Sequence, residues 1–158
     1  MAKVGKGYQI PLSWVPAKGG PIPERAISIA DGVFVVRCQH NGQWIPGKAI
    51  KGHSTSYYGN GGQEIQCTEY EFLCDSRFPQ SKSCYEWLPE KGGRVPKNAI
   101  VAGMVGLSPV YVAKGVVNGK QCVGKVHEGH TCAHLPSHGV EYPVDEYEVL
   151  VLKKKKKE

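Results

Sequence analysis

An internal duplication constrains the fold of this chain more than any other feature of its sequence. Residues 14–27 (WVPAKGGPIPERAI) match residues 87–100 (WLPEKGGRVPKNAI) at an offset of 73. The second copy then carries four extra residues, because VAGMVGLSP (101–109) stands where the first copy has SIADG (28–32). Beyond this point the offset is 77, and it holds to the end of each copy. We therefore expect one small structural unit, built twice.

Turn residues and β-branched residues predict an antiparallel meander in each copy. The chain has 20 glycines and 11 prolines, and long helical periodicity is missing, which favours an all-β class. In the first copy, Asp31-Gly32 is a predicted two-residue turn before a strand at 33–40. Pro46-Gly47 is predicted to end the next strand, and 64–74 to close the unit. We predict two tandem antiparallel β-sheet repeats, packed against each other as one compact unit.

Composition shifts along the chain divide it into four parts. The first repeat is predicted at 13–74, a polar linker at 75–86, the second repeat at 87–152 and a disordered lysine tail at 153–158. The net charge is +6, of which the tail supplies +4 from five lysines and one glutamate, so the body carries only +2. A nearly balanced body without interleaved basic and aromatic residues disfavours specific binding of nucleic acid.

The first residues, MAKVGKGYQIPL, contain no apolar core of a signal peptide, and no apolar run approaches about 18 residues. We therefore expect no membrane span and a cytoplasmic location, with non-classical release left open. Six cysteines are then expected to be reduced, with disulfides as the alternative if the protein leaves the cell.

The repeated pattern resembles the DM-nine repeat family over residues 14–152. It runs from Trp through Pro-x-x-Ala-Ile to an apolar strand ending in Arg or Lys, then an Asn-Gly turn, Gly-Lys and Tyr-Glu-x-Leu. Two-repeat members of that family include a mannose-binding lectin of bivalves. The resemblance implies a non-catalytic lectin that binds mannose-containing glycans. It also implies a homodimer and a role in innate immunity.

In that lectin type, sugar contact is attributed to an aspartate before the first apolar strand and to the lysine of Pro-Gly-Lys. Carried over, these residues are Asp31 and Lys48. The second copy keeps Lys125 but has no acidic residue between Ile100 and Tyr111, so one site per chain is expected.

Further candidates for sugar contact are Gln43, Trp44 and Lys125. Trp44 has no aromatic counterpart in the second copy, where Gln121 stands, and an aromatic ring covers the apolar face of a pyranose. A cleft between the repeats that holds Asp31 beside Lys48 would favour the lectin.

Plainer interpretations stay open for each of these residues. Asp31 is also a turn former, Lys48 is also readable as an exposed charge, and Lys125 as structural or solvent-facing. Trp14 and Trp87 recur in both copies, which favours core packing. The alternative function is a protein-interaction or structural repeat module that binds no sugar.

Catalysis and metal binding find little support in the sequence, so we expect no enzymatic activity, no catalytic residues, no cofactor and no metal. Glycosidases need two carboxylates in different environments. The candidates Glu64, Glu69 and Glu71 recur in the second copy, which indicates a structural role. The remaining cluster shows no closed tetrahedral spacing and is expected to be a polar loop; it comprises His127, His130, Cys132, His134 and His138.

Overall fold

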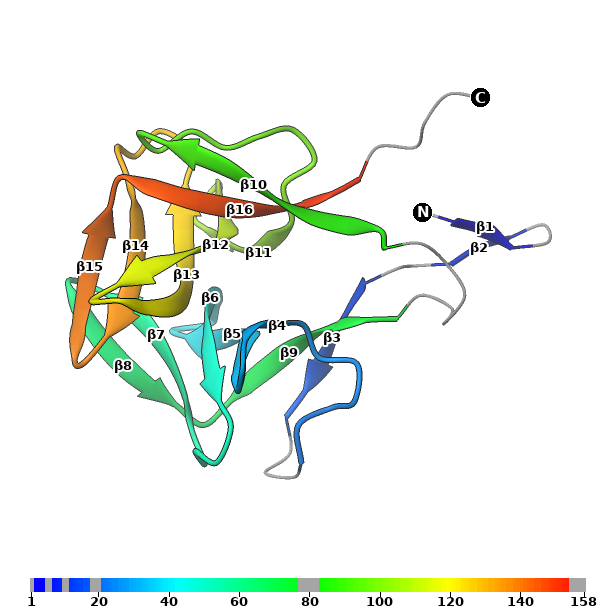
Figure 1. Ribbon diagram of the computed structural model, residues 1–158, viewed down its shortest axis with the longest axis horizontal. Coiled ribbons are helices and arrows are strands. Elements are labelled where there is room, and N and C mark those ends of the chain that lie inside the picture. Colours follow the sequence, from blue (N-terminus) through cyan, green and yellow to red (C-terminus); the bar gives the residue numbers. More distant parts are fainter. Residues whose placement is uncertain (1, 5–6, 10–11, 18–20, 77–82, 154–158) are drawn as a thin grey trace.

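The structure is a computed structural model that describes residues 2–4, 7–9, 12–17, 21–76 and 83–153. All regular structure in these ranges is β, in sixteen strands (Figure 1). Strands β1 (Ala2–Val4) and β2 (Gly7–Gln9) form a sheet of two. The other strands form one 14-stranded sheet in which every pairing is antiparallel, so the predicted all-β class is confirmed.

The two sequence repeats produce matching sets of seven strands. The first set is β3 (Leu12–Pro16), β4 (Ser28–Ala30), β5 (Val33–His40), β6 (Gln43–Ile50), β7 (Ser56–Asn60), β8 (Gln63–Cys67) and β9 (Tyr70–Asp75). The second set is β10 (Tyr85–Lys91), β11 (Val101–Val105), β12 (Ser108–Val117), β13 (Lys120–His127), β14 (Ala133–Ser137), β15 (Val140–Val144) and β16 (Glu146–Leu152).

The strand order gives the sheet a pseudo-twofold axis between the repeats. It runs β10-β16-β12-β13-β14-β15 through the second repeat and continues β8-β7-β6-β5-β9-β3 through the first. At the central junction, the N–H of Glu64 donates to the carbonyl of Gly139 at 3.1 Å. The N–H of Glu141 donates to the carbonyl of Gly62 at 2.9 Å. These four residues are related by the same offset of 77, so equal sequence positions meet across the axis.

Two strand predictions are wrong in detail. Pro46-Gly47 lies inside β6 and does not end it, because β6 continues to pair with β5 as far as Ile50. The closing segment 64–74 is divided into β8 and β9 by a bend at Thr68-Glu69. The chain therefore turns once more than predicted, and this extra turn places β8 at the junction with the second repeat.

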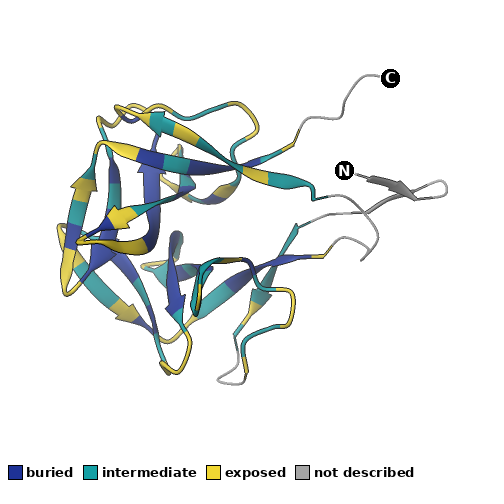
Figure 2. Ribbon diagram, viewed as in Figure 1, coloured by how far each residue is buried: buried dark blue, intermediate teal, exposed yellow. Residues whose placement is uncertain are grey.

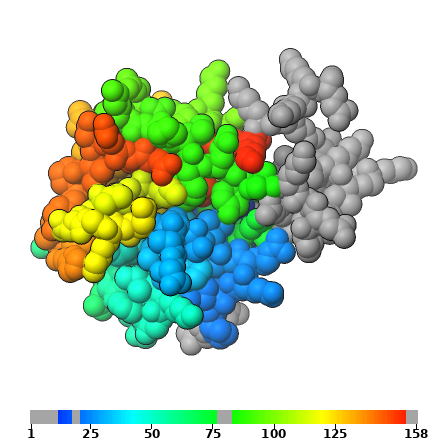
Figure 3. Space-filling model, viewed as in Figure 1, coloured from blue at the N-terminus to red at the C-terminus, as the bar shows by residue number. Residues whose placement is uncertain are grey.

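One cluster of the hydrophobic core is shared between the repeats. It combines Ile27, Val35 and Leu73 of the first repeat with Ala102, Val112, Val123 and Leu150 of the second. Trp14 and Trp87 pack against this cluster, as their recurrence predicted. Figure 2 shows buried residues concentrated on central strands such as β6 and β13, and Figure 3 shows the repeats in continuous contact. Burying both apolar faces together explains why the unit occurs twice.

The boundary predictions meet the described residues only in part. Strand β9 includes Asp75 and β10 begins at Tyr85, at the two ends of the segment predicted as a linker. Residues 77–82 of that segment and 154–158 of the lysine tail lie outside the described residues. The described ranges contain no apolar helix of membrane-spanning length.

Candidate functional site

The lysine of Pro-Gly-Lys in the first repeat reaches across to the second repeat. Lys48 lies on β6 and is 8% exposed. Its Nζ lies 3.1 Å from Glu64 Oε2 and donates to the carbonyl of Pro136 on β14 at 2.5 Å. A longer contact, 3.8 Å, joins it to Cys122 Sγ. The interpretation of Lys48 as an exposed charge is therefore wrong, because the ammonium is buried and paired.

Lys125 makes the same contacts in the opposite direction. It is 9% exposed, its Nζ lies 3.1 Å from Glu141 Oε2, and it donates to the carbonyl of Gly59 on β7 at 2.9 Å. Gly59 is the sequence counterpart of Pro136. The repeats thus exchange lysines across the pseudo-twofold axis, and each lysine is neutralised by a glutamate of its own repeat. Lys125 has the structural position that its alternative interpretation predicted.

Each glutamate also fixes the junction itself. Oε1 of Glu64 accepts a hydrogen bond from the N–H of Gly139 at 3.1 Å, and Oε1 of Glu141 accepts one from the N–H of Gly62 at 3.2 Å. A carboxylate has enough acceptor sites to serve a backbone N–H and an ammonium together. The recurrence of Glu64 as Glu141 was the sequence signal for this role, although nothing in the sequence identified the partners.

The glycine before each lysine allows the backbone of the next strand to approach closely, β7 at Gly47 on β6 and β14 at Gly124 on β13. A Cβ atom at Gly47 would lie 2.1 Å from the carbonyl oxygen of Tyr57, and one at Gly124 would lie 2.3 Å from that of His134. Both oxygens belong to the backbone. The two residues of the Gly-Lys pair therefore act together. The glycine leaves room for the backbone of the neighbouring strand, and the lysine side chain extends into the other repeat.

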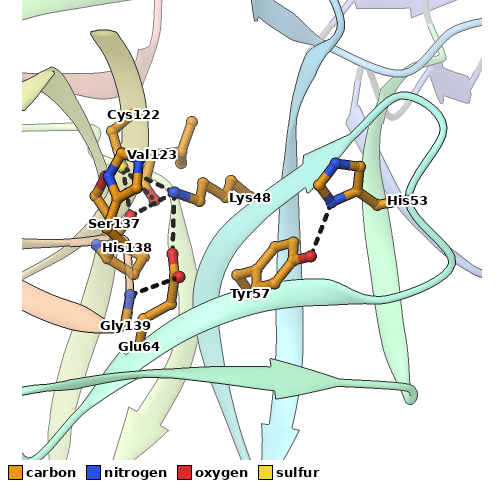
Figure 4. A network of polar contacts seen from close by, with 10 residues as sticks. Lys48, His53, Tyr57, Glu64, Cys122, Val123, Ser137, His138 and Gly139 are labelled. Atoms are coloured by element: carbon orange, nitrogen blue, oxygen red, sulfur yellow. Dashed lines mark hydrogen bonds and ion pairs between the residues drawn. The ribbon is translucent and has the colours of Figure 1, made fainter. Parts of the chain in front are cut away.

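Beside Lys48 the two repeats leave an open cleft of about 590 Å³. Lys48, His53, Tyr57 and Glu64 line it from the first repeat, and Figure 4 shows the contact between Lys48 and Glu64. Tyr57 Oη and His53 Nδ1 are hydrogen-bonded at 2.8 Å, and Lys48 Nζ lies 6.0 Å from the centroid of the Tyr57 ring. The second repeat contributes the polar side chains of Lys120, Gln121, Ser137 and His138. Sequence reasoning had named Lys48 as a sugar contact, but none of these four residues of the second repeat.

Asp31 is exposed at the turn between β4 and β5. Its neighbours Ala30 and Val33 line the cleft that contains Lys48, but Asp31 itself is not among the lining residues. The structure therefore brings the Asp31 turn to the cleft without placing its carboxylate in the wall.

On the other side of the axis, a longer hairpin covers the corresponding surface of β6. The counterpart of the short β4–β5 turn is the longer β11–β12 hairpin, which contains the four extra residues. A Cβ atom at Gly103 would lie 2.2 Å from the carbonyl oxygen of Trp44, so β11 lies directly against β6. The guanidinium of Arg37 donates to the carbonyl of Ala102 at 3.0 Å and lies 4.6 Å from the Trp44 ring. The hairpin that contains the insertion therefore covers β6 on this side.

Trp44 is thus held on the covered side of β6 and does not line the open cleft. The Arg37 guanidinium lies 4.6 Å from the rings of both Trp14 and Trp44, and its Nε donates to Glu71 at 2.7 Å. Gln43 is half-buried at the start of β6, opposite His40 on β5. Neither Gln43 nor Trp44 shares a cleft with Lys48.

Histidines replace the aromatic and aliphatic residues of the first repeat near Lys125. His127 stands in place of Ile50 and His134 in place of Tyr57, on β13 and β14, so the predicted polar loop is wrong for these two. The His127 and His130 rings are stacked at 4.6 Å. No group of three or more His, Cys, Asp or Glu side chains in the described ranges is placed to hold a metal ion.

His127 should make stability depend on pH. Burial, and then the charges of His130 and Lys125, lower the pKa of His127 to about 4 from its ordinary 6.5. Between these pH values the unfolded chain binds a proton that the folded chain excludes, so stability falls as the pH drops. We expect a loss of about 2 kcal/mol from this residue between pH 7 and pH 4.

The measurement is urea unfolding across this pH range for the wild type and for His127→Ile, which installs the residue of the first repeat. The variant should lose this part of the pH dependence. Parallel curves for the two proteins would contradict the assignment.

Fold and site together define a class of protein. It is a duplicated β-sheet protein with a pseudo-twofold axis, in which each repeat buries a lysine against the other and a cleft opens between the repeats beside Lys48. The chain belongs to the DM9 repeat family, since residues 29–144 match the DM9 repeat. The resemblance found in the repeat pattern is thereby confirmed.

Two curated relatives come from Thalassophryne nattereri. Natterin-3 is 30% identical over 138 residues, which covers 84% of this chain and 34% of that protein. Natterin-4 is 30% identical over 159 residues, covering 94% and 37% respectively. The chain thus spans about a third of the length of these relatives.

Among solved structures, the nematode sperm cell motility protein MFP2B has a similar fold. Its crystal structure aligns with a TM-score of 0.61 at 15% sequence identity, covering 90% of this chain and 45% of that one. At this identity the likeness concerns the fold alone.

Proposed function

We propose that the open inter-repeat cleft binds carbohydrate, with mannose-containing glycans as its ligands, and that the protein is a lectin without catalytic activity. The observation that supports this most is the composition of the cleft wall. An aromatic ring, a carboxylate, an ammonium and a primary amide face one cavity, from Tyr57, Glu64, Lys48 and Gln121. A pyranose offers an apolar face and several hydroxyls, which these groups complement.

The hydrogen-bonding capacity of the wall is only partly used inside the protein. The Lys48 ammonium has three donors, two of which serve Glu64 and Pro136 at short distance. The third faces Cys122 Sγ at 3.8 Å, which is the weakest of its contacts. A sugar hydroxyl would replace this contact at little cost, because a charge-assisted bond to oxygen is the stronger one.

The carboxylates of the cleft support the proposal that the protein has no catalytic activity. Glu64 is the only acidic side chain in its lining among the described residues, and it is held by Lys48 and by the N–H of Gly139. Glycoside hydrolysis uses a pair of carboxyl groups, one of them protonated. A single carboxylate, paired with an ammonium, is suited to accepting hydrogen bonds from sugar hydroxyls.

Filling the cleft should abolish binding. Gln121→Trp places in the open cleft the side chain that stands at the matching position of the first repeat. We expect the affinity for mannose to fall by at least about tenfold in isothermal titration calorimetry. Glu86→Trp, at an exposed position of β10 outside the cleft lining, is the control and should bind like the wild type. Undiminished binding by Gln121→Trp, or no binding of sugar by the wild type, would refute the proposal.

The Asp31 carboxylate is proposed to join the site from the adjacent turn. Asp31→Asn keeps the shape of the side chain and its turn-forming capacity but removes the charge. Weaker mannose binding by this variant would support the role that the resemblance implies, whereas unchanged titrations would remove Asp31 from the site.

A protein partner is the second candidate function, and a specific surface favours it. The β11–β12 hairpin carries exposed apolar side chains at Val101, Met104, Val105 and Leu107, the last of them 96% exposed. Exposed apolar residues that gather in one place mark interaction sites. The partner we propose is a second copy of this chain, which would also raise glycan affinity through avidity. Light scattering should then report a dimer that Leu107→Ser weakens, and a monomeric wild type would exclude it.

A further inference from the structure

Two cysteines of the first repeat lie together in its core. Cys38 on β5 and Cys67 at the end of β8 belong to the same buried cluster, with exposed fractions of 0% and 6%. The backbone brings their strands together, because the N–H of Gln39 donates to the carbonyl of Glu69 at 3.1 Å. Cys67 Sγ donates to the carbonyl of Glu69 at 2.9 Å, and the neighbouring Cys38 thiol is the largest influence on the Cys67 pKa.

The second repeat shows independently that these two positions touch. Gly115 is the counterpart of Cys38, and Val144 is the counterpart of Cys67. A Cβ atom built at Gly115 would lie 3.7 Å from Val144 Cγ1. The second repeat therefore adopts the same fold with no thiol at either position. Packing alone does not require the cysteine pair of the first repeat.

The two sulfurs differ in acidity in the way that a nucleophile and its partner do. The hydrogen bond with Cys38 is the largest effect on Cys67, and it outweighs burial and lowers the pKa of Cys67 to about 7. Burial raises the pKa of Cys38 well above its ordinary value. Cys67 is therefore the thiol of the pair that more readily forms the thiolate, which is the nucleophilic form.

We propose that Cys38 and Cys67 form a reversible disulfide on reaction with a peroxide, so that the first repeat is a site of redox modification. The Cys67 thiolate attacks one oxygen of hydrogen peroxide, the O–O bond breaks, and the departing hydroxide takes up a proton to become water. The Cys38 sulfur then attacks the Cys67 sulfenic acid, the S–O bond breaks, and a second water leaves with the Cys38 proton. Two thiols and one peroxide give one disulfide and two waters, and a dithiol returns both electrons and protons.

This pair differs from the other thiols of the core. Cys38, Cys67, Cys74 and Cys122 form no disulfide in the structure. Burial raises the pKa of Cys74, and it raises that of Cys122 to about 11, so both stay protonated at neutral pH. Cys67 is 6% exposed and Cys38 is fully buried, so a small oxidant is expected to meet Cys67 first. The cross-link would join β5 to β8 and restrict the unfolded chain, which stabilises the repeat.

The test treats the purified full chain with hydrogen peroxide at pH 7.5, denatures it, alkylates the free thiols and measures the intact mass. Four alkylated cysteines in place of six are expected, and peptide mapping should recover a Cys38–Cys67 cross-link that dithiothreitol removes. The oxidised protein should also melt several degrees higher.

Cys67→Val, which installs the residue of the second repeat, should keep all five remaining thiols alkylatable after the same treatment. Cys74→Ser removes a buried thiol of the same core and should still form the cross-link. Full alkylation of the wild type after peroxide, a cross-link between other cysteines, or over-oxidation of Cys67 without a cross-link would each overturn the proposal.

Discussion

Replacing Lys125 by methionine should lower the free energy of unfolding by about 3–5 kcal/mol, because it leaves a buried carboxylate without its counter-ion. The Glu141 side chain is 5% exposed, and its Oε2 accepts no hydrogen bond from the described residues, so the ammonium at 3.1 Å is its compensation. The carbonyl of Gly59 would lose a donor as well. Urea unfolding at pH 7, followed by circular dichroism, measures the loss.

The charge, and not the side-chain volume, is expected to cause this loss. Lys125→Met combined with Glu141→Gln should recover much of the stability, since the glutamine keeps the acceptor for the N–H of Gly62 and removes the unpaired charge. Arg94→Met breaks an exposed ion pair with Glu90 and should cost less than about 1 kcal/mol. A loss for Lys125→Met no larger than that for Arg94→Met would show that the exchanged lysine does not hold the repeats together.

Gly124→Ala should be at least as damaging, and Gly47→Ala should match it. In each variant the new methyl group would lie within 2.3 Å of a backbone carbonyl oxygen of the crossing strand. A backbone oxygen moves only if its strand moves, and β7 and β14 carry the acceptors for the exchanged lysines. We expect each variant to lose at least about 3 kcal/mol or to fail to fold, which thermal unfolding and soluble yield report.

A third glycine serves as a control, because it distinguishes a clash with a neighbouring backbone from the general effect of replacing glycine by alanine. The closest contact of a Cβ atom at Gly115 would be the end of the Leu135 side chain, at 3.1 Å, and its other neighbours lie at an ordinary 3.7 Å; the first repeat carries Cys38 there. Gly115→Ala should therefore cost about 1 kcal/mol or less, since a flexible side chain can adjust. Equal losses for Gly115→Ala and Gly124→Ala would contradict the proposed role of the Gly-Lys pair.

Much of the fold was predictable because the same turn and strand residues occur in both copies of the repeat. Residues that turn the chain, such as Asn41-Gly42, recur at a constant offset, and β5 occupies the predicted 33–40. Pro46-Gly47 was misinterpreted as a turn because proline and glycine favour turns. Glycine also occurs within a strand where the backbone of another strand approaches closely, as it does here. Sequence spacing alone does not distinguish these cases, since the crossing strand β7 follows ten residues later.

The site was less predictable because its contacts join the repeats. Lys48 was identified as functional, but its acceptor Pro136 lies in the other repeat, and no local pattern connects them. The asymmetry of the molecule was visible as four extra residues, yet their effect depends on where the β11–β12 hairpin packs. Only the tertiary structure shows that it lies on Trp44 and leaves the cleft beside Lys48 open.

The central claim is that the repeats form one carbohydrate-binding cleft beside Lys48. A crystal structure of the chain soaked with mannose tests it most directly. The sugar should lie in the open cleft, with its apolar face toward Tyr57 and its hydroxyls within hydrogen-bonding distance of Lys48, Glu64 or Gln121. Mannose bound elsewhere on the surface, or an empty cleft in crystals whose protein binds mannose in solution, would contradict the account.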